Sequence, residues 1–181
     1  MMSERTVLLL ITITATAWLA GCSGAGPKPV QPATPEQQAQ LLDRFKALEG
    51  EWTMPDEKGV PQLAAVFKVT SAGFAVREVM FPGTPHEMTN MYHMDGQSLV
   101  MTHYCAIGNQ PRMRATSAQG NRVEFGPDSI TNFLPTHEGY MGSVVVEFKN
   151  DNEVTYFWKH LNREGKSDAA HDPAFVLTRR R

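Results

Sequence analysis

Apolar and polar positions follow two different periods along the chain. Between residues 35 and 48 the apolar side chains recur at helical spacing, at Leu41, Leu42, Phe45 and Leu48. The run begins at Thr34-Pro35, a residue that can cap backbone amides followed by proline at the first helical position. The pattern therefore predicts one amphipathic helix over residues 35–48, which ends near Gly50.

After Gly50 the period changes to two, which is typical of strands with one buried face. Short β-branched and aromatic runs alternate with turn residues such as Asp95-Gly96. About eight to ten strands are expected, and the clearest lie at 63–70, 74–81, 88–94, 98–105, 113–118, 122–125, 141–148, 154–160 and 174–179. The fold class is therefore mainly β. We expect an antiparallel meander, which closes into a barrel because closure removes exposed strand edges.

Two short motifs resemble those of lipocalin-like barrels, the calycin group. Gly50-Glu51-Trp52 is similar to the Gly-x-Trp that starts the first strand in that group, and residues 175–179 are similar to its closing strand. The resemblance implies a lipocalin-like barrel in which Arg179 packs across Trp52, both in structural roles. The stretch from His103 to Met113 otherwise resembles a segment of uncharacterised bacterial proteins, which implies no function.

The N-terminal residues have the pattern of an export signal. Arg5 precedes an apolar run from Val7 to Leu19, which is shorter than the roughly 18–20 residues of a membrane-spanning helix. The residues that follow, Leu19-Ala20-Gly21-Cys22, resemble the bacterial lipobox. The resemblance implies that residues 1–21 are a lipoprotein signal peptide and that Cys22 is lipidated. Stable anchoring needs more than one acyl chain, which the family chemistry supplies.

Three regions follow from this interpretation. Residues 22–34 are small, polar and proline-rich, which predicts a flexible linker after the lipid, and residues 35–181 form one domain by length. Ser23 resembles the residue of lipoproteins sorted to the outer membrane, so we expect the periplasmic face of that membrane. The lipid makes the membrane a partner, and a protein partner stays open. The net charge of −2 predicts no affinity for nucleic acid. With Cys22 lipidated, Cys105 has no disulfide partner.

Residues 86–115 are rich in methionine and histidine, which raises two interpretations. If Asp95-Gly96 is a two-residue turn, Met94 pairs with Gln97 and Met88 pairs with His103. A soft-metal set would then share one face of the hairpin. The alternative is that methionine fills an irregular β-rich interior, which we favour because Met adapts to gaps in cores. The set of the metal alternative is His86, Met88, His103 and Cys105.

The favoured function is binding of a small, largely apolar or lipid-like ligand inside the barrel. The turn at residues 108–112 is expected to place polar groups at one mouth of the barrel, just after His103 and Tyr104. The candidate ligand-binding residues are Met101, His103, Tyr104, Asn109, Gln110, Arg112 and Trp158.

Other functional classes receive less support from the sequence. No nucleophile elbow, zinc-protease motif or phosphate-binding glycine loop is present, so no catalytic residue and no cofactor are predicted. Nitrobindins, which are lipocalin-like barrels, hold heme through a late histidine, and the resemblance leaves His160 or His171 as heme ligands in an alternative. A second alternative is a solidly filled barrel whose outer surface binds another envelope protein.

Overall fold

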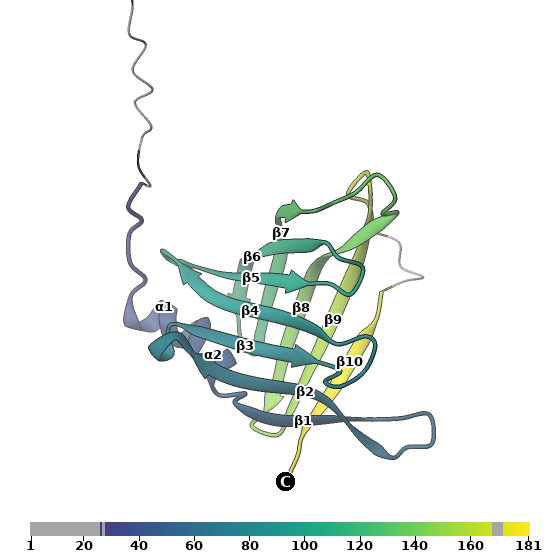
Figure 1. Ribbon diagram of the computed structural model, residues 1–181. Coiled ribbons are helices and arrows are strands. Elements are labelled where there is room, and N and C mark those ends of the chain that lie inside the picture. Colours follow the sequence, from purple (N-terminus) through teal and green to yellow (C-terminus); the bar gives the residue numbers. More distant parts are fainter. Residues whose placement is uncertain (1–25, 27, 168–171) are drawn as a thin grey trace, which may run out of the picture.

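The computed structural model describes residues 26, 28–167 and 172–181. They form a closed antiparallel barrel preceded by two short helices (Figure 1). The predicted signal peptide, the predicted lipidation site Cys22 and the candidate heme ligand His171 lie outside the described residues. In the part of the chain that is described, neither helix is long and apolar enough to cross a bilayer.

Two helices stand where the sequence pattern predicts one. Helix α1 spans Pro35–Gln40, and a capping box at Thr34 starts it: the Thr34 hydroxyl accepts from the Gln37 amide, while the Gln37 side chain accepts from the Thr34 amide. Helix α2 spans Leu42–Lys46. The backbone leaves helical geometry at Leu41, with φ −116° and ψ −95°. The break lets Leu41 and Leu42 both be buried, at 8% and 2% exposure.

The strands follow one another around the barrel in chain order, and β1 pairs with β10 to close it. The fold predicted from the sequence, an antiparallel meander closed into a barrel, is therefore confirmed. The strands are β1 (Gly50–Pro55), β2 (Pro61–Thr70), β3 (Ala75–Met80), β4 (Met88–Asp95), β5 (Ser98–Tyr104), β6 (Gln110–Gln119), β7 (Arg122–Thr131), β8 (Gly139–Asn150), β9 (Glu153–Asn162) and β10 (Ala174–Arg179), with a 3-10 turn, η1 (Ser71–Gly73), between β2 and β3.

Helix α2 closes one end of the barrel. Phe45 is completely buried and stacks on Tyr92, with 4.4 Å between ring centroids. Its ring also meets Phe125 and Phe148 edge-on, at 5.9 and 5.3 Å. These aromatic side chains therefore fill the barrel interior at the helix end.

Trp52 and Arg179 join the first and last strands at the same end. The Arg179 guanidinium lies over the Trp52 indole, 4.4 Å from the ring centroid. It also donates hydrogen bonds to the carbonyls of Ala47 and Glu49, at 2.7 and 2.8 Å. The indole nitrogen of Trp52 donates to the Leu48 carbonyl at 2.7 Å. These contacts fasten the segment after α2 onto the barrel closure.

The β4–β5 hairpin corrects the predicted register by two residues. The loop consists of Gly96 and Gln97, so Asp95 pairs with Ser98, and His103 lies opposite Asn90 rather than Met88. Gly96 has a φ of +60° at the first loop position, which glycine adopts readily. Because side chains alternate with a period of two, the shift keeps each residue on its expected face.

The core is drawn from a continuous part of the chain. All of the residues of the hydrophobic cluster lie between Leu41 and Leu177. The helix cap at Thr34 and the strand closure by Arg179 lie just outside these limits. A chain that comprises residues 23–181 thus contains every residue of this cluster.

Candidate functional site

An apolar pocket of about 260 Å³, called the mouth pocket below, opens at the end of the barrel away from the helices. Its position follows from the strand ends, because Met80 is the last residue of β3 and Met88 is the first residue of β4. Strand β1, in contrast, begins at the helix end. The lining consists of Met80, His86, Met88, His103, Cys105, Ala106, Ile107, Met141, Trp158, Pro173 and Phe175.

A buried polar chain leads from the barrel interior to this pocket. The Glu78 carboxylate accepts hydrogen bonds from the Tyr92 hydroxyl at 2.6 Å and from the Asn90 side-chain nitrogen at 2.7 Å. The oxygen of the same Asn90 amide lies 2.7 Å from Nδ1 of His103. Glu78, Asn90, Tyr92 and His103 are all at most 1% exposed. The chain connects three adjacent strands, because Glu78 pairs with Asn90 and Asn90 pairs with His103.

These hydrogen bonds define which nitrogen of His103 carries the proton. The ionised Glu78 carboxylate can only accept, so in that form Asn90 presents its nitrogen to Glu78 and its oxygen to His103. An amide oxygen also only accepts, so Nδ1 of His103 must donate the hydrogen. Nε2 of His103 therefore keeps a free lone pair. It is buried and has no hydrogen-bond partner among the described residues.

Trp158 supplies a second polar atom without a partner. Its indole lines the pocket beside His103, with 5.1 Å between the ring centroids. The Nε1 atom is buried, and no described group accepts its hydrogen. Buried polar atoms are nearly always hydrogen-bonded in native proteins. Two residues of the apolar lining thus each carry one buried nitrogen without a described partner, an acceptor on His103 and a donor on Trp158.

Burial shifts the two ionisable ends of the polar chain in opposite directions. Desolvation raises the pKa of Glu78 to about 7, although the hydrogen bonds from Asn90 and Tyr92 oppose the rise. Desolvation lowers the pKa of His103 to about 4. His103 is therefore neutral at pH 7, and its Nε2 atom can accept a hydrogen bond or bind a metal.

The candidate ligand-binding residues separate into interior and outer groups. His103 and Trp158 line the pocket together, and Met101 is buried deeper in the core cluster. Asn109 is also completely buried, and neither polar atom of its side chain has a described partner. Asn109 is not among the residues that line the pocket.

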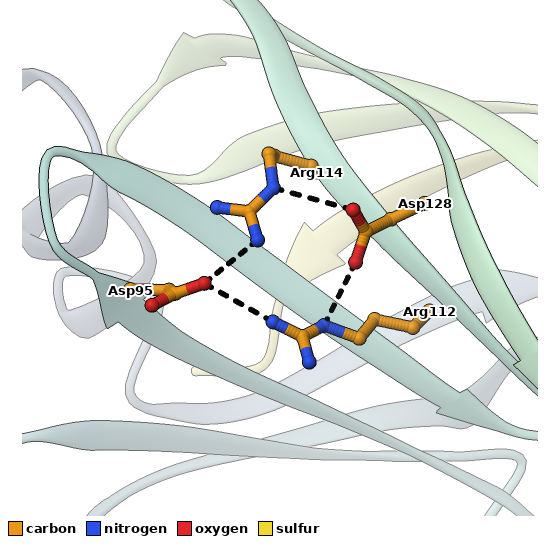
Figure 2. A network of polar contacts seen from close by, with 4 residues as sticks. All are labelled: Asp95, Arg112, Arg114 and Asp128. Atoms are coloured by element: carbon orange, nitrogen blue, oxygen red, sulfur yellow. Dashed lines mark hydrogen bonds and ion pairs between the residues drawn. The ribbon is translucent and has the colours of Figure 1, made fainter. Parts of the chain in front are cut away.

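The other three candidates, Tyr104, Gln110 and Arg112, line a separate outer groove together with Thr102, Ser129 and Thr131. Arg112 belongs to an ion-pair network there, in which Arg112 and Arg114 both contact Asp95 and Asp128, as Figure 2 shows. The two guanidinium groups and two carboxylates balance one another. Their distances run from 2.7 to 3.4 Å. This network links the β4–β5 turn to strands β6 and β7, so it braces the outer wall.

The four residues of the soft-metal alternative, His86, Met88, His103 and Cys105, all line the same mouth pocket. Met88 and His103 belong to strands β4 and β5, whereas His86 and Cys105 lie just beyond the ends of these strands. Within residues 28–167 and 172–181, no three His, Cys, Asp or Glu side chains come together as a metal-binding group. A metal in this pocket would therefore need methionine sulfur among its ligands, which suits soft ions.

The sequence interpretation did not identify the polar chain behind His103. Glu78 lies on the same face of β3 as Val76 and Met80, which are both buried. Asn90 and Tyr92 similarly occupy the buried phase of β4. A glutamate and an asparagine in the apolar phase of adjacent predicted strands were the available signal. Such residues need partners across the sheet, and the partners here are one another.

Comparison with known proteins adds no family to this description. No protein-family model matches the chain, and no curated protein matches it.

Proposed function

We propose that the protein is a lipid-anchored envelope protein whose barrel binds a small, largely apolar ligand in the mouth pocket. The observation that carries the proposal is the pairing of an apolar lining with two unpartnered buried atoms, Nε2 of His103 and Nε1 of Trp158. An apolar cavity with a few convergent polar groups is the usual form of a small-molecule site.

The energetics of the pocket favour an occupant. The methionine and aromatic side chains of the lining bury apolar ligand surface at about 25 cal/mol for each Å² removed from water. Leaving a buried donor or acceptor unsatisfied costs about 1–3 kcal/mol for each group. A ligand that contacts both atoms relieves that cost while it fills the apolar space.

The tether is the second part of the proposal. The lipobox-like residues before Cys22 support lipidation at that cysteine, and residues 23–34 would separate the membrane from the barrel. We place the protein on the periplasmic face of the outer membrane, on the basis of Ser23. Such a protein would hold its ligand close to the membrane surface.

Native mass spectrometry of residues 23–181, purified without added metal, tests the binding function. We expect an additional organic mass that leaves on denaturation. The variant Met88→Trp fills the pocket and should purify without that mass. Val176→Trp places the same side chain on β10, where Val176 is exposed, and should retain the bound mass. An organic mass that persists in Met88→Trp would contradict the proposed site.

Soft-metal binding is a second candidate, favoured by the position of His86, Met88, His103 and Cys105 around one pocket. Thioether, thiol and imidazole groups together suit copper(I). The same spectrum distinguishes the two candidates, because a bound copper ion adds a defined mass that is lost on denaturation. A heme would show itself by its absorbance.

A further inference from the structure

We infer that the mouth pocket selects a neutral hydroxyl-bearing apolar molecule, such as an aliphatic alcohol or a phenol, over acids, amines and ethers. The inference rests on the proposed function and specifies the ligand class. It follows from the unpartnered acceptor of His103 and donor of Trp158, two residues that line the pocket, and from the absence of charged side chains in the described lining.

A hydroxyl group complements both unpartnered atoms at once. Its hydrogen can be donated to Nε2 of His103, and its oxygen can accept the hydrogen of Trp158 Nε1. Both side chains line the pocket, and their rings lie side by side with 5.1 Å between the centroids. An ether oxygen accepts but cannot donate, so it would leave the His103 acceptor unmet.

The direction of the His103 acceptor is imposed by the residues behind it. Glu78 orients the Asn90 amide, and the Asn90 oxygen holds the proton of His103 on Nδ1. His103 consequently cannot turn its donor toward the pocket while this chain is intact. A ligand group that only accepts hydrogen bonds therefore finds no donor at His103.

The charges around the pocket disfavour ionised ligands. No lysine, arginine, aspartate or glutamate is among the described residues that line it. His86 lines the pocket but is exposed, whereas the buried ring of His103 presents a lone pair that repels a carboxylate. The Glu78 carboxyl group lies behind Asn90 and would add to that repulsion. An ammonium group would have to shed its hydration without an opposite charge in contact.

Four eight-carbon probes test the inference on residues 23–181 by isothermal titration calorimetry at pH 7. The probes are 1-octanol, its ether isomer 1-methoxyheptane, octanoate and octylammonium. We expect 1-octanol to bind at least tenfold more tightly than each of the others. The difference in affinity between the two isomers measures what a hydrogen bond from the ligand to Nε2 of His103 contributes, without any substitution in the protein.

The variant Trp158→Phe tests the donor while keeping an aromatic ring in the lining. It should weaken 1-octanol and 1-methoxyheptane by a similar factor, about three- to tenfold, because both oxygens accept from Nε1. Thr102→Val removes a hydroxyl group from the outer groove and should leave both affinities unchanged. A urea midpoint for each variant verifies that the barrel is folded.

The possible outcomes separate this inference from the function on which it rests. Equal affinities for 1-octanol and its ether isomer, or tighter binding of octanoate or octylammonium, would overturn hydroxyl selection and leave an apolar binding pocket. Equal effects of Trp158→Phe and Thr102→Val would also overturn it. Failure of all four probes to bind would overturn both the inference and the proposed binding function.

Discussion

Glu78 and His103 make opposite contributions to the pH dependence of stability. Burial raises the pKa of Glu78 from 4.5 to about 7, so its contribution to stability is greatest below pH 4.5 and is lost as pH rises through 7. Burial lowers the pKa of His103 from 6.5 to about 4, so its contribution is present above pH 6.5 and is lost as pH falls through 4. Between pH 4.5 and 6.5 the opposite effects of the two groups on the pH dependence of the free energy of unfolding therefore cancel.

The size of each contribution follows from the two pKa values. A difference between 4.5 and about 7 corresponds to about 3 kcal/mol, at about 1.4 kcal/mol for each pH unit. The difference for His103 has a similar size and the opposite sign. Desolvation alone lowers the pKa of His103, and the Glu78 charge is not among its causes. One group can consequently be removed without cancelling the shift of the other.

In the variant Glu78→Gln, the contribution of His103 to the pH dependence of stability is no longer cancelled by that of Glu78. The glutamine side-chain oxygen can still accept from Asn90 and Tyr92, so the polar chain is kept while the titrating group is lost. We expect the free energy of unfolding of Glu78→Gln, relative to the original protein, to rise by about 3 kcal/mol between pH 4.5 and 8. The variant itself should lose stability as pH falls from 6.5 to 4.

Urea unfolding of residues 23–181 at several pH values from 4 to 8 measures this difference. Glu57→Gln, at an exposed site in the β1–β2 loop, is the matched control and should show no comparable rise. A difference between Glu78→Gln and the original protein that stays constant over the whole range would refute the reasoning. It would mean that Glu78 titrates alike in the folded and unfolded chains.

Three further predictions concern the aromatic cluster around Phe45, the ion pairs of the outer wall and the lipid anchor. Phe45→Ala should lower the free energy of unfolding by about 3–5 kcal/mol in urea, because it empties the helix end of the barrel. Arg112→Gln should change it by about 1 kcal/mol or less, because the Arg112 ion pairs with Asp95 and Asp128 are about one-third exposed. In the full chain, Cys22→Ser should move the protein out of the membrane fraction, as immunoblots of fractionated cells would show.

The barrel could be predicted because its signals are local and repeated. Alternation of apolar and polar residues, interrupted by short turns, specifies strands and their sequential neighbours without information from distant parts of the chain. The helix was predicted less well, because nothing in the pattern at Leu41 marks the break that buries two consecutive leucines. The register of the β4–β5 hairpin depended on whether glycine occupies the first or the second loop position.

The site was predictable only in part, for a reason that lies in the closure of the barrel. His103 and Trp158 are on strands β5 and β9, so only the closed barrel sets their rings side by side. Side chains after His103 alternate between the inner and outer faces of the sheet, and those of Tyr104 and Arg112 line the outer groove. Residues chosen because they are close in sequence to the barrel mouth therefore included side chains from both faces of the strands, although only the inward-facing side chains can line the pocket.

The buried Glu78 also connects the stability of the barrel with the proposed binding site. A well-packed apolar residue at such a place is often neutral or stabilising, and a buried carboxylate is expensive even when it is hydrogen-bonded. Glu78 accepts from Asn90 and Tyr92, and Asn90 in turn holds the His103 proton on Nδ1. Packing alone would not select that orientation, because a lone imidazole could present either nitrogen to the pocket. The polar chain is therefore best explained by what it leaves on a residue that lines the pocket, a neutral acceptor without a described partner.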